Sequence, residues 1–175
     1  MKNINIRKVE LKDTKRLLEI YDYYVKNTAI TFDYETPSIN EFENKIINIT
    51  KKYPFLVIEE DGIIKGYAYA YIFKDRKAYD HSCETTIYIE KDNHKSGLGK
   101  MLYKALEEEL KKIGIINLYA CIGYPEKEDE YLTYNSRDFH KHLGYETIGE
   151  FHKCGYKFNR WYNMIWMEKF IGSHE

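Results

Sequence analysis

The feature that most constrains the fold is an amphipathic helix pattern framed by two strand-like segments. Apolar residues recur at three- and four-residue steps, which is the spacing of one helix face: Leu98, Leu102, Leu106, Leu110 and Ile113. Residues 85–89 (TTIYI) before this stripe are β-branched or aromatic, as is typical of a strand. A second strand-like segment, residues 115–122, follows Gly114. Strand, long helix and strand in succession predict an α/β fold built around a sheet.

The rest of the chain extends this alternation. Further helices are expected over residues 14–27, after the capping-box sequence Ser38-Ile39-Asn40-Glu41, and over residues 136–142. Further strands are expected over residues 3–9, 55–58, 63–73, 145–151 and 162–168. The predicted order is β-α-α-β-β-β-α-β-α-β-β, which gives a mixed sheet.

Length and charge exclude several classes of protein. The 175 residues correspond to one domain at about 150 residues per domain, so residues 1–175 are expected to form a single domain. The net charge of −1 argues against a nucleic-acid partner. The chain has no apolar run of transmembrane length and no leader-like start, so we expect a cytosolic protein with no membrane partner.

The segment from Lys95 to Lys100 (KSGLGK) is the sharpest local signal. Gly97 and Gly99 lie directly before the long helix, where backbone N–H groups and the helix dipole favour a bound diphosphate. The alternative is a glycine-rich turn that serves only to start the helix. Neither a Walker A loop nor a G-x-G-x-x-G dinucleotide motif is present here.

With its flanking residues, this loop resembles the acyl-CoA motif of the GNAT N-acetyltransferases. The resemblance runs from Ile4 to about Phe170, and it is closest to the phosphinothricin and methionine-sulfone acetyltransferase branch. The segments that carry it are, in order, Tyr53-Pro54-Phe55-Leu56-Val57, Gly66-Tyr67-Ala68, Ala78-Tyr79-Asp80, Glu84-Thr85-Thr86-Ile87-Tyr88-Ile89, His94 to Gly99, His140-Lys141-His142-Leu143-Gly144-Tyr145 and Lys157-Phe158-Asn159-Arg160-Trp161.

The resemblance implies a fold, an activity and a co-substrate. The fold would be a central, mostly antiparallel sheet, splayed at the cofactor slot by a β-bulge at residues 87–89 and flanked by helices. The activity would be transfer of acetyl from acetyl-CoA to a primary amine by direct attack in a ternary complex. The residues expected to bind acetyl-CoA are Ile87, Tyr88, Ile89, Lys95, Ser96, Gly97, Leu98, Gly99, Lys100 and His142. No metal is expected, because His81, His152 and His174 lack the spacing of zinc ligands.

Two residues are candidates for proton transfer. Glu84 matches the carboxylate of the similar enzymes, which would orient or deprotonate the amine. Its alternative role is a charge at a strand end. His140 lies four residues before Gly144, where many family members have a tyrosine that protonates the leaving thiolate. Its alternative role is packing within a helix.

The acceptor is expected to be a small amino-acid-like amine, of the phosphinothricin or methionine sulfone/sulfoximine type. Lys74 and Arg76 would hold its anionic group, because arginine can bind a carboxylate through two hydrogen bonds. The alternative for this segment is a solvated turn. The other residues expected at the acceptor are Phe32, Tyr69, Tyr79, Thr86 and Trp161, of which Trp161 could equally belong to the core or to a homodimer interface.

Three departures from the family pattern leave the substrate open. His94 replaces a usual Gln or Arg, Thr133 replaces a usual Asn, and residues 126–134 form a longer, acidic segment. That segment is either a solvated loop or a part that reshapes the acceptor site. Alternative functions are a polyamine or protein N-terminal acetyltransferase, and a non-catalytic acyl-CoA-binding module.

Overall fold

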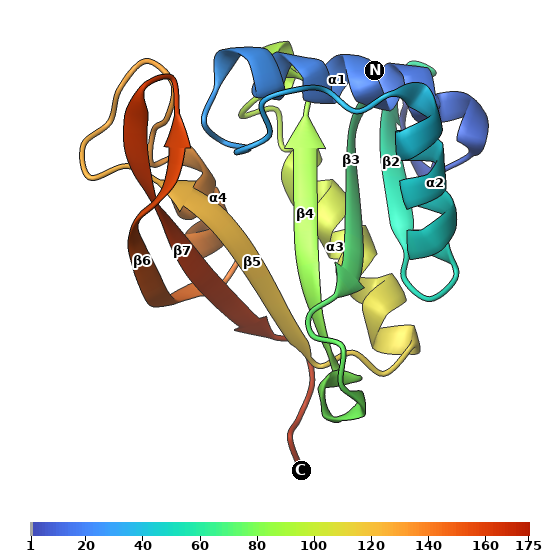
Figure 1. Ribbon diagram of the computed structural model, residues 1–175. Coiled ribbons are helices and arrows are strands. Elements are labelled where there is room, and N and C mark those ends of the chain that lie inside the picture. The colour runs from blue at the N-terminus through green and yellow to red at the C-terminus, as the bar shows by residue number, and fades with distance from the viewer. Residues whose placement is uncertain (1) are drawn as a thin grey trace.

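The apolar pattern of the sequence produces helices and strands in the predicted order, as the computed structural model shows for residues 2–175 (Figure 1). The strands are β1 (Ile4–Lys8), β2 (Phe55–Glu60), β3 (Ile63–Ile72), β4 (Ser82–Ile89), β5 (Asn117–Tyr124), β6 (Glu146–Lys157) and β7 (Arg160–Phe170). The helices are α1 (Thr14–Asn27), α2 (Ile39–Thr50), α3 (Leu98–Lys112) and α4 (Asn135–His142).

Local signals set the ends of the helices. Ser38 caps α2 through the predicted capping box: its hydroxyl accepts from the Glu41 N–H at 3.2 Å, and the Glu41 carboxylate accepts from the Ser38 N–H at 2.8 Å. Gly97 precedes α3 with a φ of 84°, and Gly114 follows it with a φ of 79°. Both φ values lie in the left-handed region that glycine adopts without a steric penalty.

The seven strands form one mixed sheet in the order β1-β2-β3-β4-β5-β7-β6. Within residues 2–175, only β4 and β5 run parallel, so the predicted mixed, mostly antiparallel sheet is confirmed. The aromatic face of β3 packs against α1 and α2, as the 6.1 Å contact between the Tyr67 and Phe42 rings shows. The face that carries Ala68 and Ala70 leaves room for α3 to cross β2 and β3 (Figure 1).

The sheet splits between β4 and β5. The two strands pair at three positions, of which Glu84 with Tyr119 is the last, and beyond it β5 turns away from β4 (Figure 1). The β-bulge expected at residues 87–89 is not present, because β4 pairs with β3 in unbroken register from Cys83 to Ile89. The split arises instead because β5 pairs with β7 along its whole length and follows that strand.

The β6–β7 hairpin is longer than the two strands predicted for it. β6 lies at the edge of the sheet, most of its residues are exposed, and its register with β7 shifts twice. An exposed and irregular edge strand lacks the apolar alternation on which strand prediction depends. Among residues 2–175, no helix combines the length and apolarity needed to cross a membrane.

Candidate active site

A cavity of about 400 Å³ occupies the split between β4 and β5. Its wall combines β3, β4 and β5 with the segment between α1 and α2, one residue each of α1 and α3, and parts of α4, β6 and β7. The predicted site residues that line it are Glu84, His140, Ile87, Tyr88, Phe32, Tyr69 and Thr86. The structure therefore gathers in one cavity both expected catalytic residues and part of each expected binding set.

Glu84 lies at the apex of the split, because it is the last residue of β4 that pairs with β5. Its side chain lines the cavity and is half-buried. Burial raises the pKa of the Glu84 carboxyl, whereas the neighbouring Tyr71 hydroxyl and the charge of Lys74 lower it. A carboxylate with a raised pKa in a cavity has the properties of a general base.

His140 is buried, and both of its ring nitrogens have partners. Nδ1 donates to the Ser136 carbonyl at 2.7 Å, because a carbonyl can only accept. Nε2 lies 3.0 Å from the Tyr103 hydroxyl and accepts from it. Burial lowers the pKa of His140 to about 4, so the ring is neutral at pH 7. In this arrangement His140 fixes the Tyr103 hydroxyl in the cavity wall.

Aromatic rings form the wall on the side of α1. The Tyr21 and Tyr88 ring centroids are 4.9 Å apart in an edge-on arrangement. Tyr69 of β3 also lines the cavity. The Tyr21 hydroxyl donates to the Asp33 carboxylate and lies 2.8 Å from the Thr31 hydroxyl. Tyrosines thus provide apolar area together with polar groups that reach the cavity.

The segment between α1 and α2 is fastened to the β6–β7 hairpin. The buried Lys157 ammonium donates to the carbonyls of Thr28 at 2.8 Å and Thr31 at 2.9 Å. The Phe32 ring lies on Gly155, where an added Cβ would come within 2.4 Å of it. These contacts place Phe32 in the cavity wall.

The two glycines of the KSGLGK segment are required for different structural reasons. Gly97 adopts the left-handed conformation in open space, whereas a Cβ on Gly99 would come within 2.9 Å of the Phe139 ring of α4. The first turn of α3 still presents N–H groups that have no acceptor within the helix. Lys95 and Lys100 lie exposed beside it. His94, one residue before this segment, contacts the Tyr24 hydroxyl at 2.6 Å.

Several predicted residues lie outside the cavity wall. Lys74 is close enough to Glu84 to lower its pKa, but Arg76 and Tyr79 lie in the exposed turn between β3 and β4. Trp161 is 60% exposed on β7, so it does not belong to the core. His142 is exposed at the end of α4.

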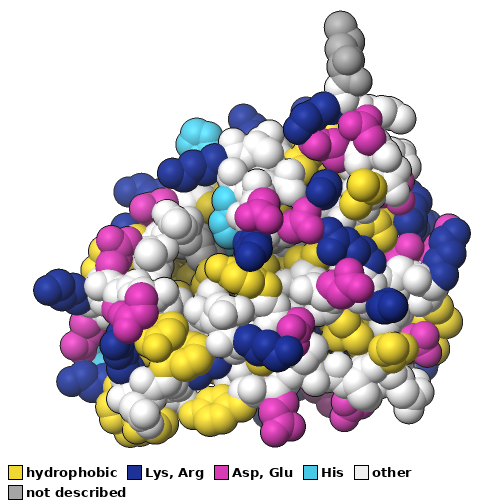
Figure 2. All heavy atoms as spheres, turned by 90° about the horizontal axis from the view of Figure 1, so that it is seen from above, with side chains coloured by type: hydrophobic (Ala, Val, Ile, Leu, Met, Phe, Trp, Pro, Cys, Tyr) yellow, Lys and Arg dark blue, Asp and Glu magenta, His cyan; other side chains and the backbone are white. Residues whose placement is uncertain are grey.

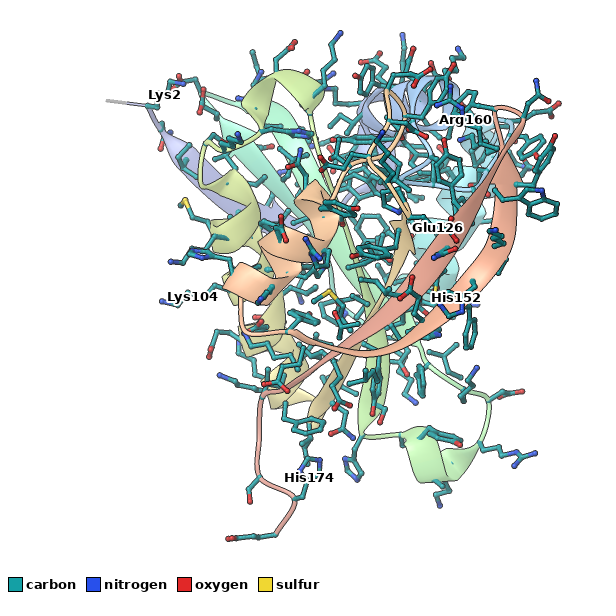
Figure 3. All side chains as sticks on the ribbon, turned by 90° about the vertical axis from the view of Figure 1, so that its left-hand side faces the viewer. Lys2, Lys104, Glu126, His152, Arg160 and His174 are labelled. Carbon is teal, nitrogen blue, oxygen red and sulfur yellow. The ribbon has the colours of Figure 1, made fainter. Side chains whose placement is uncertain are left out.

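The acidic segment 126–134 is held against the hairpin. Asp129 accepts from the backbone N–H groups of Tyr131 and Leu132 at 2.8 and 2.9 Å, and Arg160 forms a two-point ion pair with Glu130. Figure 3 shows Arg160 at the tip of the β6–β7 hairpin and Glu126 beside its strands. Because the Tyr131 carbonyl also accepts from the Ala29 N–H at 3.0 Å, the segment supports the part of the chain that carries Phe32.

Sequence reasoning missed several residues of the wall, namely Tyr21, Asp33, Tyr71, Tyr103, Cys121 and Cys154. Tyr71 had a usable signal, since it continues the alternation of Tyr67 and Tyr69 on one strand face. The others line the cavity because segments distant in the chain come into contact, and no local sequence pattern predicts such contacts. No cluster of three or more His, Cys, Asp or Glu side chains able to hold a metal ion occurs among residues 2–175.

Comparison with known proteins gives a consistent result. Residues 6–166 match the acetyltransferase (GNAT) domain family. The phosphinothricin N-acetyltransferase of Streptomyces viridochromogenes is 29% identical over 168 residues, covering 95% of this chain and 88% of the relative. The L-methionine sulfoximine/L-methionine sulfone acetyltransferase of Salmonella typhimurium is 26% identical, covering 98% and 96%.

A solved structure extends this similarity to three dimensions. The phosphinothricin acetyltransferase of Sinorhizobium meliloti, solved in complex with acetyl-CoA, superposes with a TM-score of 0.88 at 30% identity. The alignment covers 97% of this chain and 89% of that protein.

Proposed function

The chain belongs to the GNAT acetyltransferase family, and we propose that it acetylates the primary amine of a small amino-acid-like acceptor. It is an acetyl-CoA-dependent N-acetyltransferase, as the resemblance in its sequence implied. The proposed acceptor class is supported by relatives named for phosphinothricin and for L-methionine sulfoximine and sulfone. In the proposed reaction the amine attacks the thioester carbonyl directly while both substrates are bound: a C–N bond forms, the C–S bond breaks, and coenzyme A leaves as a thiolate that takes up a proton.

The residues around the split fit acetyl-CoA. Beyond Glu84, one edge of β4 has no partner strand, so the backbone of residues 85–89 can pair with the amide groups of the pantetheine arm. The N-terminus of α3, with Lys95 and Lys100 beside it, suits the pyrophosphate. When bound, acetyl-CoA supplies a thioester carbonyl that an amine can attack.

Glu84 acts as the general base in this proposal. An alkyl ammonium has a pKa of about 10.4, so the amine must lose a proton before it attacks at neutral pH. The Glu84 carboxylate accepts that proton, directly or through a water molecule. Its raised pKa brings it closer to the working pH, which improves a general base.

His140 contributes through the Tyr103 hydroxyl. Its Nδ1 proton is used by the Ser136 carbonyl, and its Nε2 carries no proton at pH 7. We therefore place the role of His140 in holding the Tyr103 hydroxyl within the wall of the cavity, where that hydroxyl can interact with the reacting groups.

The observation that carries the proposal is the position of Glu84 inside the cavity, at the last paired residue before β4 and β5 separate. The test incubates purified protein with acetyl-CoA and a panel containing phosphinothricin, methionine sulfone, methionine sulfoximine, common amino acids and spermidine. Mass spectrometry then identifies the acetylated product. Glu84→Gln is expected to lower kcat/KM at least about 100-fold while calorimetry shows unchanged acetyl-CoA affinity.

The control for this test is Glu146→Gln, which changes an exposed carboxylate of β6 and should leave the rate unchanged. Full activity of Glu84→Gln would remove Glu84 as the base. No acetylated product from any amine would contradict the proposed acceptor class.

One observation favours a second acceptor class, the cationic amines. The two acidic residues of the cavity wall are Asp33 and Glu84, and the residues that line it among positions 2–175 include no Lys or Arg. A polyamine would complement such a wall, whereas the nearby Lys74 favours an acceptor with an acidic group. Preference for spermidine over the amino-acid analogues would support the cationic class.

A homodimer is also part of the proposal. The Trp161 and Tyr156 rings lie 4.8 Å apart, centroid to centroid, in a tilted arrangement on the exposed β6–β7 hairpin, with 60% and 44% of their surfaces exposed. Exposed aromatic side chains of this kind are enriched at protein interfaces. Light scattering that reports twice the 21.1 kDa chain mass would support the dimer, and a single chain mass would contradict it.

A further inference from the structure

Tyr71 lies at the end of a row of three tyrosines on one face of β3. The ring centroids of Tyr67 and Tyr69 are 6.4 Å apart, and those of Tyr69 and Tyr71 are 6.0 Å apart. Tyr67 and Tyr69 are buried, whereas Tyr71 is half-buried and lines the cavity. Core packing therefore accounts for Tyr67, whereas Tyr69 and Tyr71 both line the cavity, and Tyr71 is the more exposed of these two.

The neighbour of Tyr71 across the sheet is Glu84. The two residues are register partners on the antiparallel strands β3 and β4, so their side chains leave the same face of the sheet. Both side chains line the cavity, and the Tyr71 hydroxyl lies close enough to the Glu84 carboxyl to lower its pKa. β-Sheet geometry thus places a phenol next to the proposed base.

The protonation states of the two side chains fix the direction of a hydrogen bond between Tyr71 and Glu84. Burial and the negative charge of Glu84 both raise the pKa of Tyr71 above its usual value, so the phenol keeps its proton at neutral pH. An ionised carboxylate can only accept a hydrogen bond. A hydrogen bond between the two side chains must therefore run from the phenol to the carboxylate, the direction that lowers the pKa of Glu84 against the effect of burial.

A carboxylate on the wall of an open cavity needs such a partner to keep one orientation. The charge that acts on Glu84 is that of Lys74, whose ammonium lies 5.3 Å from the centroid of the Phe73 ring. Lys74 acts on Glu84 through its charge, whereas Tyr71 is the side chain that strand register places directly beside Glu84. A group that fixes the rotamer of a base in this way preorganises the site.

We propose that Tyr71 is a positioning residue for Glu84: its hydroxyl binds one carboxylate oxygen and leaves the other directed into the cavity, toward the acceptor amine. This inference rests on the proposed function, in which Glu84 is the base. The amine proton passes to Glu84, and Tyr71 keeps its own proton throughout.

The test measures kcat/KM against pH for the wild type, Tyr71→Phe, Glu84→Gln and the double variant. Tyr71→Phe keeps the ring and removes only the donor. It is expected to lower kcat/KM about tenfold at neutral pH and to move the acid limb of the profile to higher pH, with unchanged acetyl-CoA affinity. In the Glu84→Gln background, Tyr71→Phe should cause no further loss. The control Tyr23→Phe removes a half-buried hydroxyl of α1 outside the cavity and should leave the profile unchanged.

Two results would overturn the inference while the proposed function stands. In one, Glu84→Gln abolishes the acid limb but Tyr71→Phe leaves it in place. In the other, the losses of the two single variants multiply in the double variant. Failure of the proposed function gives a different pattern, in which Glu84→Gln keeps the wild-type profile or no amine is acetylated.

A second measurement tests Tyr71 without any turnover. Carbon NMR of protein labelled at the glutamate carboxyl groups follows the titration of Glu84, whose signal is assigned by its loss in Glu84→Gln. Tyr71→Phe should raise the pKa of Glu84, because burial then acts without the hydroxyl. An unchanged Glu84 titration would contradict the proposed contact.

Discussion

At the scale of single residues, burial acts on the two candidate catalytic groups in opposite directions and favours the neutral form of each. It raises the pKa of Glu84 and lowers that of His140. Glu84 lies at the wall of a cavity with Tyr71 and Lys74 as compensating neighbours, so it remains available as a carboxylate. His140 has only neutral partners, the Ser136 carbonyl and the Tyr103 hydroxyl, and therefore stays uncharged.

The buried His140 makes stability depend on pH. Its folded-state pKa of about 4 lies below the unfolded value of 6.5, so between these values the unfolded chain binds a proton that the folded chain does not. The free energy of unfolding should therefore fall as the pH drops from about 6.5 toward 4, by about 3 kcal/mol from this group. Urea unfolding at pH 7, 5.5 and 4.5 measures the change.

The matched variant is His140→Gln, which can still accept from the Tyr103 hydroxyl and does not titrate. Its free energy of unfolding should fall less than that of the wild type over the same pH range. Carboxylates titrate in both proteins, so the difference between the two isolates His140. Parallel curves for the two proteins would show that His140 does not titrate in this way.

At the scale of elements, sequence pattern located the helices better than the site. The bounds of α1 and the end of α3 before Gly114 follow directly from apolar periodicity and glycine. The KSGLGK motif lies on a local glycine pattern, whereas Glu84 was predicted through the resemblance to the family. The split of the sheet follows from no local pattern, because it depends on β5 pairing with β7, a contact between segments distant in the chain. The same holds for Phe32, whose place depends on Gly155 of β6.

The contact between Phe32 and Gly155 gives a prediction for the acceptor side of the cavity. A Cβ at Gly155 would come within 2.4 Å of the Phe32 ring, which must then move. Gly155→Ala should lower the free energy of unfolding by about 1–3 kcal/mol and raise KM for the amine. Acetyl-CoA affinity should stay unchanged, since residues 85–89 and 95–100 are untouched. Steady-state kinetics and calorimetry measure both quantities.

β6 also provides the control for this variant. A Cβ at Gly149 would meet no atom within 4 Å, and its φ is not in the left-handed region. Gly149→Ala should therefore leave both KM and stability within error of the wild type. An equal change in KM for the two variants would show that the effect comes from the strand and not from Phe32.

At the scale of the whole molecule, positive and negative charges balance in total number and are also mixed over the surface. The 27 Lys and Arg residues oppose 28 Asp and Glu residues, and Figure 2 shows the two kinds interspersed over the face seen from above. Acetyl-CoA recognition must then come from local geometry more than from a long-range field. That geometry is the split itself, which divides the sheet into β1–β4 and β5–β7 with three paired positions joining them.

This division predicts where acetyl-CoA stabilises the chain. The backbone of residues 85–89 is paired with β3 but not with β5, so its free edge should gain partners when acetyl-CoA binds. Hydrogen exchange should slow most in that segment and at the start of α3, and less in the β1–β2 pairing, which is already complete. At about 100 times the Kd, global stability should also rise by about 2.7 kcal/mol. A uniform slowing across the sheet, with no excess at residues 85–89, would contradict binding along the edge of β4.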